Sequence, residues 1–245
     1  MDISISIVSH GQIALVAELL ADLQQHCRDT ELEVIITLNV EEALPFRLQQ
    51  FSYPVSVVRN VMPAGYGANH NQAFTRASGR YFCAMNPDIR LTGNPYITLL
   101  ACMENSMAGV AAPLVLSQDG RVEDSARHFP SPLKILRKAL GSSVRPDYAI
   151  GSAPISPDWV AGMFMLFPRR VFKRLGGFDE RYFLYYEDVD ICARLKLLGY
   201  KTVLCPQVNV THWAHRSSHR NLKYMAWHLR SIVRFFLSPV YRQIK

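Results

Sequence analysis

The sequence predicts an α/β protein with a mostly parallel central sheet flanked by helices. Two observations support this: short apolar runs rich in Val and Ile recur along residues 1–116, and segments with helical spacing of apolar residues separate them. Strands are expected at Ile3–Val8, Glu33–Leu38, Val55–Val58, Tyr81–Met85 and Val110–Leu116. Helices are expected between them at Ile13–Leu23, Ala68–Ala77 and Tyr96–Met103.

Polar residues follow several of these predicted strands. His10, Asn39, Asn60 and the segment Asn86-Pro87-Asp88 each stand where a strand ends. Ligands of such sheets bind beyond the carboxyl ends of the strands, so we expect these side chains on one polar rim.

The composition is that of a globular protein, and the charge is unevenly placed. The 245 residues are 49% hydrophobic and 19% charged, which fits one domain, 1–245. Residues 1–100 carry 6 Lys and Arg against 9 Asp and Glu, whereas residues 101–245 carry 21 against 11. The basic half therefore predicts an anionic partner, such as phosphates, nucleic acid or a lipid surface. The five cysteines are widely spaced without a CxxC pair, which indicates reduced thiols rather than disulfides or a zinc site.

The second half is less regular. Residues 117–158 are rich in Gly, Ser, Pro and Asp and predict an irregular, partly mobile segment, inside which Leu133–Leu140 forms a short basic amphipathic helix. The run Val160–Phe167 returns to the core and is too short to span a bilayer. Thr202–Leu204 is expected as an edge strand. Leu222–Phe236 has an apolar helical stripe, whose usual role is packing on the protein's own core.

The stretch Gly176–Leu198 has the strongest chemical pattern. Glu187, Asp188 and Asp190 place three carboxylates in four positions, at the start of a predicted helix. The ordinary interpretation is that acids complement the helix dipole. The alternative is a general base, because a carboxylate held against aromatic walls has a raised proton affinity. Aromatic side chains directly precede the acids, at Tyr182, Phe183, Tyr185 and Tyr186.

Three further patterns are weaker one by one. In Arg59–Asn71, two glycines precede a predicted helix and three asparagines lie around them, so this segment is either a plain turn or a site for phosphate and sugar hydroxyls. The carboxylate of Asp88 is either part of an Asx turn or a hard-metal ligand. His212 is either structural or a ligand, and basic residues beyond it indicate phosphate contacts at Arg216, Arg220 and Lys223.

Taken together, these residues resemble the inverting family 2 glycosyltransferases with a GT-A fold, over nearly the whole chain. Among them, the bacterial rhamnosyltransferases of O-antigen assembly are the most similar, with matches in the opening Ile7–Gly11 and the tail Trp227–Ser231. The motifs that carry the resemblance are Ala64–Asn71, Asn86-Pro87-Asp88, Val160–Gly162, Gly177–Glu180, Glu187–Asp190 and His212.

The resemblance implies a role for each matching residue. Asp188 matches the catalytic base, Asp88 the acid that holds metal and diphosphate, and His212 a histidine that completes the metal site in some members. Glu187 is expected to orient the base or bind acceptor hydroxyls, and Asp190 to support the helix. Trp159 and Gly162 are expected to border the acceptor. The donor-binding residues are expected to be Ser9, His10, Asn39, Asn60, Gly65, Gly67, Asn71, Asn86 and Asp88.

Two positions depart from the family pattern. The first acid of the DxD-type motif is Asn86 here, which predicts a weaker metal site or one that relies on His212. The nucleoside-pocket acid of many members is Asn39 here, whose amide oxygen still accepts from a pyrimidine N–H.

The resemblance implies an enzyme that moves L-rhamnose from dTDP-L-rhamnose to a polyprenyl-diphosphate-linked saccharide, with Mg²⁺ or Mn²⁺ as cofactor. Residues 1–116 would bind the nucleotide sugar, and 117–245 would bind the acceptor and supply the base. A cytoplasmic enzyme peripheral to the inner face of the membrane follows from the lipid-linked acceptor and the two basic amphipathic segments. The alternatives are a donor linked to UDP or GDP, a sugar-nucleotide pyrophosphorylase, and a basic nucleic-acid-binding module. The pyrophosphorylase interpretation lacks a basic, Gly-rich N-terminal loop, and the nucleic-acid interpretation lacks aromatics interleaved with basic residues.

Overall fold

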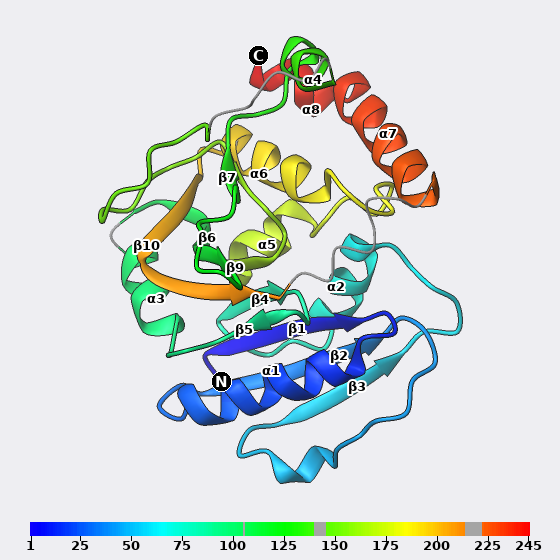
Figure 1. Ribbon diagram of the computed structural model, residues 1–245, viewed down its shortest axis with the longest axis vertical. Coiled ribbons are helices and arrows are strands. Elements are labelled where there is room, and N and C mark those ends of the chain that lie inside the picture. Colours follow the sequence, from blue (N-terminus) through cyan, green and yellow to red (C-terminus); the bar gives the residue numbers. More distant parts are fainter. Residues whose placement is uncertain (105, 140–145, 214–221) are drawn as a thin grey trace.

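A twisted central sheet organises the molecule, with α1 on one face and most of the other helices toward the opposite end (Figure 1). The computed structural model describes residues 1–104, 106–139, 146–213 and 222–245. Within these ranges the main sheet has eight strands in the order β3-β2-β1-β4-β9-β6-β10-β5, and β7 pairs with β8 in a small second sheet.

The first half confirms the predicted alternation of strands and helices. Strands β1, β2, β3 and β4 lie side by side and run parallel. The elements are β1 (Ile3–Ser9), α1 (Ile13–His26), β2 (Leu32–Leu38), η1 (Leu48–Gln50), β3 (Val55–Arg59), α2 (Tyr66–Phe74), β4 (Tyr81–Met85), β5 (Ile89–Arg90), α3 (Tyr96–Glu104) and β6 (Ala108–Ser117).

Strand β1 is buried on both faces, which its alternating sequence explains. Ile3, Ile5 and Ile7 enter the core beneath α1. Ser4 and Ser6 face the other side, where the Ser4 hydroxyl donates to Glu33 at 2.6 Å and Ser6 pairs with His70 Nδ1 at 2.7 Å. Buried hydroxyls with partners are tolerated, and so β1 lies in the middle of the sheet.

The second half adds strands of mixed direction. Its elements are β7 (Ala126–Arg127), α4 (Pro132–Ala139), β8 (Trp159–Val160), β9 (Phe164–Pro168), α5 (Arg169–Leu175), α6 (Glu187–Leu197), β10 (Lys201–His212), α7 (Leu222–Leu237) and α8 (Pro239–Ile244). Strand β9 runs antiparallel to both of its neighbours, β4 and β6, so only part of the sheet is parallel.

The structure extends or refines three predictions for this half. The Thr202–Leu204 edge strand belongs to the longer β10, which lies inside the sheet between β6 and β5. The run Val160–Phe167 is broken at 161–163, between β8 and β9. Residues 117–158 contain strand β7 and, as predicted, a short helix, α4. Residues 140–145 lie outside the described residues.

Helices α4, α7 and α8 gather at the end of the molecule opposite α1 (Figure 1). Helix α6 lies beneath them and is fixed by buried apolar residues, including Val189, Ile191 and Leu195. No helix in the described ranges has the length and apolar character needed to span a membrane.

Candidate active site

Asp188 lies in the first turn of α6, where the backbone N–H groups of Gly162 and Val189 donate hydrogen bonds to its carboxylate. Its Oδ2 accepts a hydrogen bond from Gly162 N–H at 3.0 Å, and its Oδ1 accepts from Val189 N–H at 2.8 Å. Burial raises the pKa of the Asp188 carboxyl above its ordinary range, against the opposing effects of these N–H donors and the charge of Arg127. A carboxylate with raised basicity in a fixed orientation is suited to removing a proton.

The loop before α6 is held in a strained conformation. Tyr185 and Tyr186 both have left-handed backbones, with φ of 70° and 71°. Such non-glycine residues cost about 1–3 kcal/mol each, so the surroundings must hold them. The carbonyl of Phe183 accepts from Tyr66 N–H at 2.9 Å, and the carbonyl of Leu184 accepts from the Ser231 hydroxyl at 2.9 Å. Contacts from α2 and α7 therefore fix the loop that delivers Asp188.

Glu187 is more deeply enclosed than Asp188. It is 5% exposed, and its Oε2 is buried without a hydrogen-bond partner among the described residues. Burial, reinforced by the neighbouring charge of Asp188, raises the pKa of Glu187 well above its ordinary range. The two carboxyl groups thus differ in role: Glu187 tends to keep its proton, which leaves Asp188 as the basic member of the pair.

We expect Glu187→Gln to stabilise the protein at neutral pH. Because the folded state raises the pKa of Glu187, the wild-type protein loses stability as the pH rises from the ordinary glutamate range through that raised pKa. A neutral amide avoids this loss, and the gain should be about 1–3 kcal/mol, the range for an uncompensated buried polar group. Unfolding by urea at about pH 4 and at neutral pH tests this, with the difference small at the lower pH. A variant less stable than wild type at neutral pH would contradict it.

A cavity of about 540 Å³ opens beside Asp188 and Glu187. Trp159, predicted to border the acceptor, lines it, and its indole N–H donates to the carbonyl of His128 at 3.0 Å. Gly162 lies behind Asp188, and a Cβ there would stand 3.3 Å from the hydroxyl of Tyr66. The remaining lining residues come from the segments around β7 and α4, from the loop before α6, from α6 and from α7, and include Arg127, Lys134, Tyr186, His228 and Ile232.

The two cations of this cavity, Arg127 and Lys134, were not predicted as site residues. Arg127 pairs with Asp124 at 2.7 Å and lies over the Trp159 ring, with 5.6 Å to its centroid. Lys134 pairs with Asp147. The net basic charge of residues 101–245 was the available signal, but it gave no positions.

Asp88 and His212 meet as predicted, through strand pairing. Strand β5 follows Asp88 directly and pairs antiparallel with the end of β10, which sets Ile89 opposite His212. His212 Nε2 lies 3.2 Å from Asp88 Oδ2, and His212 Nδ1 lies 3.0 Å from Glu123 Oε2. Burial lowers the pKa of His212, but the bonds and charges of Asp88 and Glu123 outweigh it and raise that pKa. Glu123 was not predicted, because only the fold brings it to His212.

One oxygen of Asp88 remains open to a ligand. Its Oδ1 is buried and has no hydrogen-bond partner among the described residues. In the same ranges, no group of three or more His, Cys, Asp or Glu side chains is arranged to hold a metal ion. Arg216 and Arg220, expected to contact phosphates, lie outside the described residues.

A short backbone segment links the Asp88 motif to Asp188. Asn86 N–H donates to the carbonyl of Met163 at 2.9 Å, and Gly162 N–H donates to Asp188. The hydroxyl of Tyr66 donates to the carbonyl of Gly162. The ends of β4 and α6 are therefore joined through residues 162–163.

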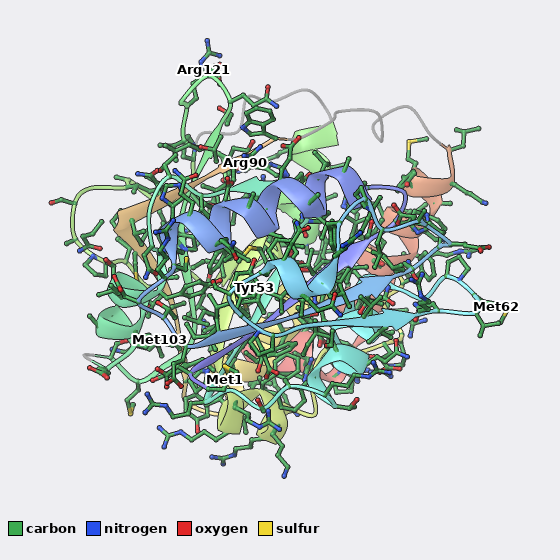
Figure 2. All side chains as sticks on the ribbon, turned by 90° about the horizontal axis from the view of Figure 1, so that it is seen from below. Met1, Tyr53, Met62, Arg90, Met103 and Arg121 are labelled. Atoms are coloured by element: carbon green, nitrogen blue, oxygen red, sulfur yellow. The ribbon has the colours of Figure 1, made fainter. Side chains whose placement is uncertain are left out.

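Three residues of the predicted polar rim, His10, Asn39 and Asn60, form a connected network. Asn39 Oδ1 accepts from Ala64 N–H at 2.8 Å and from Asn60 Nδ2 at 2.9 Å, and Asn39 Nδ2 lies 3.2 Å from His10 Nδ1. These bonds hold the loop after β3, whose exposed residue Met62 points away from the rest of the molecule (Figure 2). The use of Asn39 to read a nucleobase stays a prediction, since both acceptor positions of its oxygen are occupied by protein donors here.

Ser9 stands at the end of β1 and contacts an acid that the sequence analysis missed. Its hydroxyl donates to Glu42 at 2.7 Å, and Glu42 also accepts from the backbone N–H groups of Gly11 and Ile13. Glu42 thus covers the start of α1. Its position three residues after Asn39 was the signal that could have identified it.

Gly65, Gly67 and Asn71 pack against the loop that precedes α6. A Cβ on Gly65 would lie 2.6 Å from the carbonyl oxygen of Phe183, and one on Gly67 would lie 2.6 Å from Phe178 Cβ. Asn71 bonds the backbone of Phe178 at both ends of its amide, each at 2.8 Å. The structure gives these residues a clear packing role, and their donor contacts stay a prediction. An open pocket of about 550 Å³ beside them includes Asn60 and Asn71 in its lining.

Asp190 differs from its two acidic neighbours. It is buried and pairs with Arg194 one turn later, at 2.7 Å. This ion pair within α6 agrees with the expected supporting role.

Comparison with known proteins places this site in a family. The family described as "Glycosyltransferase like family 2" matches residues 153–230, which include Trp159, Asp188 and His212. The rhamnosyltransferase WbbL of Escherichia coli K12 is 27% identical, over 94% of this chain and 91% of its own length. The N-acetylglucosaminyl-diphospho-decaprenol L-rhamnosyltransferase of Mycobacterium tuberculosis CDC 1551 is 32% identical, over 60% of this chain and 51% of its own length.

Solved structures share the fold at low identity. GalNAc-T7, solved with UDP, GalNAc and Mn²⁺, has a TM-score of 0.67 at 18% identity, over 90% of this chain and 44% of its own. The mannosyltransferase PcManGT of Pyrobaculum calidifontis, solved with GDP-Man and Mn²⁺, has a TM-score of 0.64 at 15% identity, over 95% of this chain and 64% of its own. The chain is a glycosyltransferase with a GT-A fold, is similar to the family 2 glycosyltransferases over residues 153–230, and resembles the bacterial O-antigen rhamnosyltransferases.

Proposed function

We propose that this enzyme transfers L-rhamnose from dTDP-L-rhamnose to a sugar carried on a polyprenyl diphosphate, with inversion at the transferred carbon. The observation that supports this most is Asp188, a basic carboxylate held by backbone N–H groups in the wall of a cavity. One base beside one acceptor cavity suits a single displacement, because no covalent intermediate requires a second nucleophile.

In this reaction the Asp188 carboxylate removes the proton from an acceptor hydroxyl. The hydroxyl oxygen forms its bond to C1 of the donor sugar as the bond from C1 to the diphosphate oxygen breaks, and the electron pair leaves with the nucleoside diphosphate. Gly162 N–H and Val189 N–H keep the base oriented, and the Trp159 ring offers a face on which the acceptor sugar stacks.

Asp88 and His212 are suited to hold a divalent cation, Mg²⁺ or Mn²⁺. The buried Asp88 Oδ1, which has no hydrogen-bond partner among the described residues, fits a hard cation. Such a cation commonly takes one or two protein carboxylates and completes its shell with water and substrate phosphates. Glu123 beside Nδ1 would keep a proton on that atom, so that Nε2, which lies 3.2 Å from Asp88 Oδ2, would serve as a ligand once deprotonated. When bound, the cation would neutralise charge on the departing diphosphate. The Mn²⁺ in both structural neighbours described above agrees with this proposal.

The choice of donor and acceptor rests on the relatives. Two of them are rhamnosyltransferases, and the name of one specifies a decaprenyl-diphosphate-linked acceptor. Arg127 and Lys134 in the wall of the cavity would exchange their partners Asp124 and Asp147 for such an acceptor's diphosphate. The neighbours with UDP or GDP-mannose keep a UDP- or GDP-linked donor as the alternative.

The proposal is tested by a donor screen with a polyprenyl-diphosphate-linked N-acetylglucosamine acceptor. Each of dTDP-rhamnose, UDP-glucose, UDP-N-acetylglucosamine and GDP-mannose is incubated separately, and the products are resolved by mass and by the anomeric NMR coupling. Transfer from dTDP-rhamnose with inversion supports the proposal, whereas transfer only from a UDP or GDP sugar would refute the donor assignment. Retention of configuration would refute the single displacement.

A peripheral position on the inner face of the cell membrane follows from the lipid-linked acceptor. Both predicted amphipathic segments, α4 and α7, contribute residues to the wall of the acceptor cavity. A membrane against these helices would bring a lipid-linked sugar directly to Asp188, and no nucleic-acid partner is needed to explain the basic half.

A further inference from the structure

Helix α7 has two unlike faces. The face toward the protein contains the buried Ser231 and Phe235, and Trp227 stacks near Phe183 with ring centroids 4.6 Å apart. Of the predicted apolar stripe, Ile232 and Phe236 are half-buried, whereas Met225, Leu229 and Val233 face away from the core. With Leu222 and Leu237 these three form an exposed apolar stripe, each residue between 49% and 76% exposed.

A groove of about 620 Å³ runs along this exposed stripe. It is bordered by α7, the start of α8 and Arg181 from the loop before α6. Leu229, Val233 and Leu237 form its apolar side, and three guanidinium groups stand beside them, those of Arg181, Arg230 and Arg234.

Two of these three arginines are free to meet an outside anion. Arg181 is held by Asp179 at 2.6 Å. Arg230 and Arg234 form no ion pair with any residue in the described ranges, and the Arg234 guanidinium lies over the ring of Tyr182, 5.9 Å from its centroid. The last 24 residues, 222–245, contain five Lys and Arg and no Asp or Glu. The groove is therefore complementary to an anionic partner.

We propose that this groove binds an anionic phospholipid of the bilayer surface. The phosphate would lie between Arg230 and Arg234, and the upper acyl chain carbons would lie along Leu229 and Val233. A cationic row next to an exposed apolar stripe is the arrangement of helices that lie in a membrane interface, whereas nucleic acid offers nothing to cover apolar side chains. This inference deepens the proposed function, because it rests on a lipid-linked acceptor and names the surface that meets the membrane.

The same helix connects the groove with the catalytic cavity. His228 and Ile232 line the cavity. Leu229 and Val233, which directly follow them in the sequence, line the groove. A lipid in the groove would thus seat α7 on the bilayer with the acceptor cavity at its surface.

The test compares binding of the full chain to vesicles of phosphatidylcholine with and without phosphatidylglycerol, by sedimentation at low and high salt. Arg230→Gln with Arg234→Gln should weaken binding to the anionic vesicles about 30-fold, from about a fivefold loss for each arginine near the surface. The matched control is Arg170→Gln with Lys173→Gln, two exposed cations on α5, and should change binding less than about threefold. Leu229→Ser with Val233→Ser should abolish the binding that remains at high salt, since salt screens only the charge contribution.

The outcomes separate this inference from the proposed function. Transfer is followed in parallel with a water-soluble, short-chain acceptor. If the wild-type protein transfers the sugar but the α7 and α5 variants bind anionic vesicles equally, the groove is not a lipid site and the function stands. Binding that requires polyprenyl phosphate in neutral vesicles, or release by millimolar inorganic phosphate alone, would also overturn the inference. If vesicle binding depends on Arg230 and Arg234 but no donor supports transfer, the inference stands and the function fails.

Discussion

Replacing Asp188 with asparagine should reduce sugar transfer about a thousandfold, the middle of the range that general-base catalysis supplies. The amide keeps the shape of the carboxylate, and its oxygen can still accept from Gly162 N–H. What is lost is basicity, so donor affinity should change little. Turnover at saturating acceptor and donor affinity by calorimetry measure the two effects. Turnover above a tenth of wild type would exclude Asp188 as the base.

The pH profile gives an independent check on the same residue. Because burial raises the pKa of Asp188, the wild-type rate should fall on the acid side at a pH above the ordinary aspartate range. Asp190→Asn serves as the control, because it breaks the ion pair with Arg194 and should lower stability without moving this acid limb.

Removing divalent metal should reduce transfer by at least about a hundredfold, the size of losing one preorganised charge at a leaving group. Asp88→Asn should give a similar loss without chelator, because its carboxylate is the proposed ligand with the open oxygen. Activity in excess EDTA, and its recovery with Mg²⁺ or Mn²⁺, measures the first effect.

A second readout separates metal binding from catalysis. Mn²⁺ should raise the thermal unfolding midpoint of the wild-type protein and of Asp119→Asn, a control acid on the exposed turn after β6, but not that of Asp88→Asn. Full activity in excess chelator would refute the metal proposal, and the role at the leaving group would then fall to His212.

Local patterns predicted most elements of the first half because apolar spacing reports which residues of a segment are buried. Strand order is different, since it depends on partners far away in the chain. The Thr202–Leu204 run was therefore recognised as a strand, but its continuation to His212, where β5 pairs with Thr211 and His212, was not predicted. Periodicity also found the stripe of α7 but not the direction it faces.

The positions of single side chains in the candidate site were predictable, whereas their catalytic and metal-binding roles stay predictions. Asp188 stands where its acidic, aromatic context predicted, and Asp88 meets His212. Residues that matter because they are small, or because they pair with a distant residue, were harder to predict. Gly65 packs against Phe183, and Glu123 contacts His212, only in the folded chain.

The segment 162–163 carries a consequence for stereochemistry. Gly162 N–H fixes the base and the carbonyl of Met163 fixes Asn86, two residues before Asp88. In the proposed reaction, the direction of attack and the direction of departure are thus referenced to the same two residues, 162 and 163, instead of to two independently moving loops. Thermal motion of the sheet would carry nucleophile and leaving group together, so their collinearity would survive fluctuations that displace the site as a whole.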